Sequence, residues 1–140
     1  MPIDVGELEP QPSPQAIDIV VITHGRLDLT MVCITALYEN TKAPFHLIVV
    51  DDSDIHNDLT PNYCDRLRLD HENVTYIHSD KPYKSGNQIF NIALQHGDSP
   101  YLAVVVNSVR VEPDWEDTAL TLMEQNSKIG VIGFKCLFPN

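Results

Sequence analysis

Polar and charged side chains follow four apolar segments of this sequence, each at the point where the apolar run ends. They lie in segments 23–26, 51–54, 79–84 and 107–110. Ionised Asp51 and Asp52 can only accept hydrogen bonds, whereas Lys84 and Arg110 carry positive charge that can offset an anion such as a phosphate. Asp is also common in turns at strand ends, so a purely structural role for the two carboxylates stays open. The spacing identifies a candidate polar site.

The elements that must position these side chains are short β-branched runs alternating with amphipathic segments. Strands are predicted over 17–23, 45–50, 74–78, 101–106 and 129–134, and helices over 29–40, 63–69 and 86–96, with a last one opened by Glu112-Pro113-Asp114. This alternation favours right-handed crossovers and an α/β fold with three α/β/α layers around a mainly parallel, Rossmann-like sheet. Ligands of such sheets collect at the carboxyl ends of the strands, where all four polar segments fall.

Apolar spacing predicts which faces of the helices are buried. The first helix has apolar residues at positions 29, 32, 33, 36 and 37, the stripe of a helix that packs by one side. The last helix has Pro in its first turn and acids near its positive end, with Trp115, Ala119, Leu122 and Met123 as its predicted inner face.

Composition limits the class of protein. The 140 residues carry a formal net charge of −11 with a pI near 4.7, and the few basic residues form no stripe, which argues against a nucleic-acid partner. No apolar run approaches the roughly 20 residues of a transmembrane helix, and the N-terminus is acidic and rich in proline, so we expect a cytoplasmic protein. Residues 1–16 are expected to form an extended or disordered leader, and residues 17–140 a single domain.

Several familiar sites are missing from the sequence. It has neither a G-x-G-x-x-G turn after the first strand nor a G-K-[ST] phosphate loop, and no G-x-S-x-G elbow. A receiver domain would carry a pair of acidic residues after its first strand, where this sequence has Thr23 and His24, and that interpretation is therefore disfavoured. Cys33, Cys64 and Cys136 are far apart and are expected to be buried free thiols.

Three strings in order carry a resemblance to a known family. They are the strand ending in Thr23-x-x-Arg26, the strand ending in Val49-Val-Asp-Asp-Ser-Asp54, and the string Asn107-Ser-Val-Arg-Val-Glu-Pro-Asp-Trp115. Together they resemble the N-terminal nucleotide-binding half of family-2, GT-A-type glycosyltransferases. The resemblance runs from about Ile17 to the end of the sequence and implies a domain that binds a nucleotide-sugar donor.

The resemblance implies a role for the residues that follow the first two strands. Asp52, the second acid of the string, would accept a hydrogen bond from the base of the donor, with Asp51 beside it. An acceptor-only carboxylate favours uracil, thymine or guanine, whose ring N–H is a donor, and we expect a UDP-type donor. Segment 23–26, which comprises Thr23, His24, Gly25 and Arg26, would line the base and ribose.

The sequence departs from this family after the fourth strand, where relatives carry an Asp-x-Asp pair that holds Mg²⁺ or Mn²⁺. The corresponding positions are Val106, Asn107 and Ser108. A metal site is therefore disfavoured and no cofactor is expected. Asn107, Ser108, Arg110 and Lys84 stay as predicted donor-binding residues, the two cations to offset the charge of the diphosphate.

The acceptor-binding half of the family, which supplies the general base, is absent from this sequence, so we expect a truncated domain with little activity of its own and assign no catalytic residue. The alternative is a degenerate, non-catalytic member that serves as a binding or assembly module. A sheet cut off after its fifth strand would leave an apolar edge, which predicts weak self-association.

Overall fold

The chain folds around one four-stranded sheet in which every strand pair is parallel. The computed structural model describes residues 16–79, 81–82 and 85–138, so nearly all of the predicted leader, and Lys84, lie outside the described residues. The strands are β1 (Ile17–Thr23), β2 (Phe45–Asp51), β3 (Val74–His78) and β4 (Tyr101–Val106), in the spatial order β3-β2-β1-β4. The strand order turns back between β1 and β4, and this is the point where a ligand crevice forms in doubly wound sheets.

The two central strands are buried on both faces. Six of the seven β1 side chains and five of the seven in β2 are buried, which agrees with their β-branched composition. Residues of odd number in both strands, such as Ile19 and Val49, join the larger core cluster, while Val20 and Ile48 join a smaller cluster on the opposite face. The sheet therefore has two separate apolar cores, one for each helical layer.

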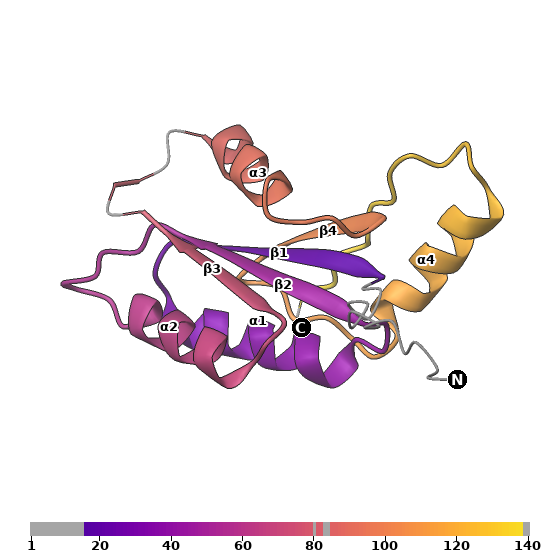
Figure 1. Cartoon of the computed structure of the whole chain (residues 1–140). Coiled ribbons are helices and arrows are strands. Elements are labelled where there is room, and N and C mark those ends of the chain that lie inside the picture. Colours follow the sequence, from indigo (N-terminus) through magenta and orange to yellow (C-terminus); the bar gives the residue numbers. More distant parts are fainter. Residues whose placement is uncertain (1–15, 80, 83–84, 139–140) are drawn as a thin grey trace, which may run out of the picture.

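Three helices supply the outer layers (Figure 1). Helices α1 (Leu27–Asn40) and α2 (Thr60–Asp70) cover one face of the sheet, and α3 (Gly86–Leu94) lies on the other. The predicted three-layer α/β/α architecture is confirmed. The inner face of α1 is shifted from the predicted stripe, because Thr30 and Ile34 are buried while Val32 is exposed.

Helix α4 (Trp115–Gln125) lies near the amino ends of the strands, and its buried face differs from the predicted one (Figure 1). Leu122 is exposed, whereas Glu116 is buried. The Glu116 carboxylate accepts hydrogen bonds from the backbone N–H groups of Lys42 and Ala43, at 2.6 and 3.0 Å. A polar contact to a distant loop therefore anchors this helix, and apolar spacing could not predict it.

The predicted fifth strand over 129–134 is wrong. This segment forms no regular element and pairs with none of the strands that the structure describes. Gly130 and Gly133 weaken its strand preference, and Phe134 packs against Trp115 of α4, with ring centroids 5.5 Å apart. As a result Val131 is 89% exposed.

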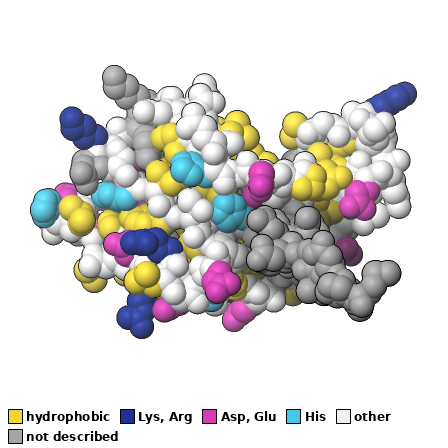
Figure 2. Space-filling view, viewed as in Figure 1, with side chains coloured by type: hydrophobic (Ala, Val, Ile, Leu, Met, Phe, Trp, Pro, Cys, Tyr) yellow, Lys and Arg dark blue, Asp and Glu magenta, His cyan; other side chains and the backbone are white. Residues whose placement is uncertain are grey.

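Strand β4 forms one edge of the described sheet, and the side chains of Leu102, Val104 and Val106 on one of its faces are 41–48% exposed. This is an exposed apolar face of β4 and not the edge left after a fifth strand that the sequence predicted, and self-association stays a prediction. On the face of the molecule in Figure 2, Lys and Arg side chains are scattered singly rather than gathered into a stripe.

The thiols follow the prediction in two of three cases. Cys33 and Cys64 are buried, and burial raises the pKa of the Cys33 thiol to about 12. Cys136 is exposed, contrary to expectation, because it follows the segment that does not form a strand. Within the described part of the chain, no helix is both long and apolar enough to span a membrane.

Candidate functional site

The register of the sheet brings the predicted site residues to one edge. Thr23 at the end of β1 lies opposite Asp51 at the end of β2, and Asp51 lies opposite His78 at the end of β3. Two hydrogen bonds extend the pairing just past the strand ends. The Asp52 N–H donates to the Thr23 carbonyl (3.3 Å), and the Asn107 N–H donates to the Ile22 carbonyl (3.2 Å). Four segments distant in the sequence therefore meet at the carboxyl edge.

The turn from β1 to α1 has an unusual backbone. Gly25 and Arg26 have φ values of 73° and 59°, so two consecutive residues adopt the left-handed conformation. Glycine adopts this conformation without strain, and a Cβ atom at position 25 would in addition come within 2.9 Å of an Asp58 carboxylate oxygen. For Arg26 the conformation is strained, and such strain persists only where surrounding contacts hold it.

The neighbouring residue, Gly25, is held by contacts from three segments of the chain. The Gly25 N–H donates to the Ser53 hydroxyl at 2.5 Å. The Gly25 carbonyl accepts from the Thr23 hydroxyl and from the Asn107 side-chain amide, both at 3.2 Å. The Asn107 amide also reaches the Thr30 hydroxyl at 3.0 Å. Thr23 and Asn107 were both predicted to contact the nucleotide-sugar donor. In the structure their side chains form hydrogen bonds that hold the shape of the turn.

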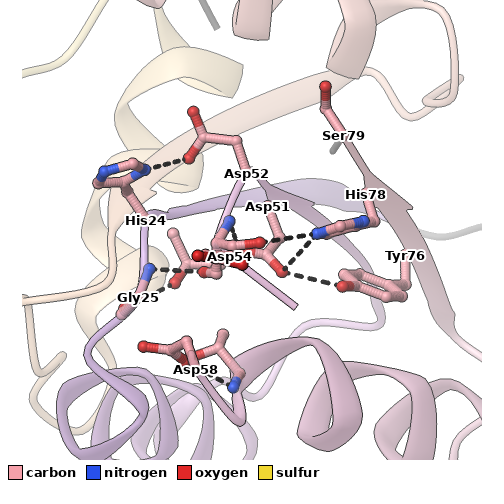
Figure 3. Close-up of polar contacts among 12 residues, drawn as sticks. His24, Gly25, Asp51, Asp52, Asp54, Asp58, Tyr76, His78 and Ser79 are labelled. Carbon is pink, nitrogen blue, oxygen red and sulfur yellow. Dashed lines mark hydrogen bonds and ion pairs between the residues drawn. The ribbon is translucent and has the colours of Figure 1, made fainter. Parts of the chain in front are cut away.

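Asp52 and His24, both predicted site residues, form a pair at this edge (Figure 3). The His24 Nδ1 atom lies 2.5 Å from the Asp52 Oδ1 atom. The imidazole is 73% exposed, whereas the Asp52 carboxylate is only 9% exposed. The Asp52 carboxylate is thus held in a covered position with a planar ring against it, and the ring itself is open to solvent.

Asp51 faces the other way, into the protein. Its carboxylate is fully buried and accepts hydrogen bonds from the Ser53 N–H (2.9 Å), from the Ser53 hydroxyl and from the Tyr76 hydroxyl (2.9 Å). The His78 Nε2 atom lies 4.0 Å from the same carboxylate and 2.9 Å from the Ser53 carbonyl oxygen. Burial, followed by the bond to Asp51, raises the pKa of the Tyr76 phenol, which therefore stays a hydrogen-bond donor.

Sequence reasoning did not identify Tyr76 and His78 as part of the site, and it included Ser53 only as a member of segment 51–54, without a role. The available signal was the alternation of strand side chains: Asp51 continues the series Leu47, Val49 that faces the core. A carboxylate on that face requires donors from neighbouring elements, and the hydroxyl and imidazole near the end of β3 can supply them.

The remaining predicted residues lie toward solvent. Arg26 forms a two-bond pair with Asp28 at 2.9 and 3.0 Å. Ser108 and Arg110 are exposed. The structure therefore brings His24, Gly25 and Asp52 together, and leaves the two arginines predicted for the site, Arg26 and Arg110, at the surface.

The residues at the position of the family's metal pair do not fit a divalent cation. The two acid positions hold Val106, which has no ligand atom in its side chain, and Ser108, which has a neutral hydroxyl, while the amide of Asn107 between them is turned toward the β1 turn. Hard cations such as Mg²⁺ prefer anionic oxygen ligands, which none of the three residues supplies. In the part of the chain that the structure describes, no three His, Cys, Asp or Glu side chains are arranged to hold a metal ion.

An open cavity of about 420 Å³ lies at the opposite, amino edge of the sheet. Its lining residues are His46, Glu72, Gln95, His96, Gly97 and Asp98. None of the predicted donor-binding residues lines it. The carboxyl edge is the candidate site because the exposed ring, the covered carboxylate and the strained turn meet there.

Comparisons with known proteins identify a family and a fold. A sequence profile described as Glycosyl transferase family 2 matches residues 18–135. Among solved structures, S. aureus TarS 1-349 superposes with a TM-score of 0.66 at 16% identity, covering 78% of this chain and 32% of that one. Its complex with UDP-GlcNAc gives the same TM-score at 15% identity, covering 78% of this chain and 31% of that one.

A mannosyltransferase from Pyrobaculum calidifontis, PcManGT, in complex with GDP-Man and Mn²⁺ superposes with a TM-score of 0.62 at 17% identity, covering 79% of this chain and 32% of that one. The chain thus spans about a third of the length of these proteins. A search by sequence among curated proteins gave no match. At these identities the superpositions establish the fold alone.

Proposed function

The chain belongs to glycosyl transferase family 2, and we propose that it binds a nucleotide-sugar donor of the UDP type at the carboxyl edge of its sheet. Asp52 is the residue that recognises the base. One observation carries this proposal, namely that a heterocyclic ring nitrogen, His24 Nδ1, already lies 2.5 Å from the Asp52 carboxylate.

That contact supports the base-recognition role through its chemistry. An ionised carboxylate is an acceptor, so the nitrogen facing it is an N–H donor. Uracil and guanine present a ring N–H of the same kind, whereas cytosine presents a lone pair at the corresponding atom. The base takes the place of the imidazole at Asp52, and the exposed ring of His24 is free to move aside and flank it.

The turn formed by Gly25 and Arg26 lies beside Asp52 and borders the same site. Thr23 and Asn107 hold the shape of this turn, and Asp51 holds the segment that carries Asp52. Arg110, together with Lys84 outside the described residues, offsets the charge of the diphosphate in place of a metal ion. Ser108, which is exposed, completes the proposed donor-binding residues.

Isothermal titration calorimetry tests this proposal. We expect UDP to bind the chain whether or not Mn²⁺ is added, and Asp52→Ala to weaken binding at least about 30-fold, the effect of removing a hydrogen bond to a charged group. Asp65→Ala is the matched control, because it removes the same charge from an exposed pair with Arg68 on α2. UDP binding that survives Asp52→Ala would contradict the proposal.

We also propose that this chain turns over little donor by itself. The residues at the metal-pair position do not fit Mg²⁺ or Mn²⁺, so the leaving nucleotide lacks the usual charge stabilisation. Hydrolysis of a UDP-sugar at ordinary enzyme rates that depends on added Mn²⁺ would contradict this.

The alternative, a non-catalytic binding or assembly module, is favoured by the same lack of metal ligands and by the pairing of Arg26 with Asp28 rather than an open cation. It predicts no heat with UDP or UDP-sugars. It also fits weak self-association through the exposed face of β4, which sedimentation at rising concentration would detect as an increasing sedimentation coefficient; a concentration-independent monomer would contradict that association.

A further inference from the structure

We propose that Tyr76 and His78 on β3 are positioning residues that hold Asp52 and the Gly25 turn in the shape that a nucleotide base requires. This inference rests on the proposed function and extends it to a strand that neither the sequence motifs nor the family resemblance brought into the site. Neither side chain touches the base; both act through Asp51 and Ser53.

The first step is the buried carboxylate of Asp51. It is fully buried beside an apolar core, where a carboxylate is stable only if donors surround it. The Tyr76 hydroxyl is the donor that comes from another strand, at 2.9 Å, and the other two hydrogen bonds come from Ser53. Tyr76 therefore fixes where the end of β2 lies relative to β3.

The second step passes through Ser53. Its hydroxyl donates to Asp51 and accepts from the Gly25 N–H at 2.5 Å, so a continuous chain of hydrogen bonds runs from Tyr76 on β3 to the turn after β1. Such chains polarise and align each member. Asp52 lies between Asp51 and Ser53 in the sequence, and the network therefore holds its backbone from both sides.

The third step is the contact of His78 with the backbone. Its Nε2 atom lies 2.9 Å from the Ser53 carbonyl oxygen, to which a proton on Nε2 donates, and 4.0 Å from the Asp51 carboxylate. In Figure 3, Tyr76 and His78 lie on the far side of Asp51 from the Asp52–His24 pair. The two residues thus support the site from behind and leave its open side to a ligand.

Tyr76→Phe and Tyr38→Phe make a matched comparison. Both changes remove one half-buried hydroxyl that donates at 2.9 Å, to Asp51 in one case and to Asn73 in the other. Tyr38 bonds near the amino ends of the strands, so its loss affects stability and leaves the carboxyl edge intact. At His78, Gln retains an N–H near the place of Nε2, whereas Leu removes it.

Two measurements on the full chain decide the inference. In the free protein, amide hydrogen exchange at Gly25 should accelerate at least about fivefold in Tyr76→Phe and His78→Leu, and stay as in the unmodified chain in Tyr38→Phe and His78→Gln. In calorimetry, the ratio of the dissociation constants of CDP and UDP should fall at least about threefold in the first two variants only.

The outcomes separate the two proposals. Unchanged Gly25 exchange in Tyr76→Phe, or equal changes in Tyr76→Phe and Tyr38→Phe, would overturn the positioning role even if UDP binds well. Failure of the unmodified chain to bind UDP would contradict the proposed function, while the exchange comparison in the free protein would still decide whether Tyr76 and His78 hold the turn.

Discussion

Apart from the longer contact between His78 and Asp51, each edge of the sheet carries one histidine–aspartate pair, and these two pairs differ in access to solvent. At the carboxyl edge, His24 and Asp52 are 73% and 9% exposed, with 2.5 Å between the paired atoms. At the amino edge, His46 and Asp18 are 15% and 4% exposed, with 3.2 Å between them. The same two residue types thus form an open pair at one edge and an enclosed pair at the other.

The amino-edge pair is enclosed, and its polar atoms already form hydrogen bonds with neighbouring residues. Asp18 accepts hydrogen bonds from the Ser99 N–H (2.9 Å) and hydroxyl (2.8 Å), and the second ring nitrogen of His46 lies 2.8 Å from the Thr75 hydroxyl. A pair whose polar atoms are all hydrogen-bonded within the protein stabilises the fold. A pair with an exposed ring can exchange that ring for a ligand. The comparison therefore assigns a structural role to the amino-edge pair and a binding role to the carboxyl-edge pair.

Asp18→Ala should have the largest effect on stability, a loss of about 3 kcal/mol, because it leaves the Ser99 donors and His46 without their buried acceptor. Asp52→Ala should cost less than about 1 kcal/mol, as is usual for a pair with an exposed member. Urea unfolding followed by circular dichroism measures both. Equal losses would remove the distinction between the two edges.

The glycines at the two edges should respond differently to alanine. A Cβ atom at Gly97 would overlap the buried Asp18 carboxylate and lie 3.3 Å from Ile48, so Gly97→Ala should cost about 2 kcal/mol. Gly25→Ala meets the end of the Asp58 side chain, which can move, and costs about 1 kcal/mol from its left-handed backbone. UDP affinity should fall only in Gly25→Ala; a fall of similar size in Gly97→Ala would contradict the comparison.

Thr75→Val and His24→Ala compare the partners of the two pairs. Thr75→Val removes the hydroxyl from the second nitrogen of the enclosed His46 and should cost about 1 kcal/mol. His24→Ala should cost less than about 0.5 kcal/mol, because the imidazole it removes is largely solvated. Thermal unfolding of the two variants beside the parent measures the difference, and a greater loss for His24→Ala would show that the open pair is structural.

The smallest expected effect concerns acid. Hydrogen bonds from Thr60 lower the pKa of Asp58, the carboxyl beside the Gly25 turn. A pKa that is lower in the folded state stabilises the fold above the ordinary value of about 3.9, and this stabilisation is lost as the pH falls through the folded-state pKa. Asp58→Asn should therefore lower stability slightly above about pH 5, and its difference from the parent should shrink as the pH falls below about 4. A difference that stays the same size, or grows, at low pH would contradict this assignment.

The sequence predicted most of the sheet because its strands are apolar, β-branched runs with clear ends. β1, β3 and β4 have the predicted bounds, and β2 extends one residue further, to Asp51. The segment 129–134 has a similar composition but no partner strand among the described residues, and its two glycines oppose an extended conformation. Composition alone cannot distinguish a paired strand from an unpaired one.

The site could be predicted only as a set of candidates. His24 and Asp52 were both expected at the carboxyl edge, but their pairing depends on the register of β1 and β2. Tyr76 and His78 were not identified, because their contacts to Asp51 and Ser53 join residues 25 positions apart in the sequence. Glu116 shows the same limit, since its Oε1 atom accepts two hydrogen bonds from a loop more than 70 residues away.

The most direct test of the central claim, that Asp52 reads a ring N–H, is a calorimetric titration of the chain with UDP and with CDP. Uracil offers the N–H that the carboxylate accepts, whereas cytosine offers a lone pair that it repels. We predict at least tenfold tighter binding of UDP, with the preference reduced in Asp52→Asn, whose amide can also donate. Equal affinity for the two nucleotides, or a preference that Asp52→Asn leaves intact, would contradict the account.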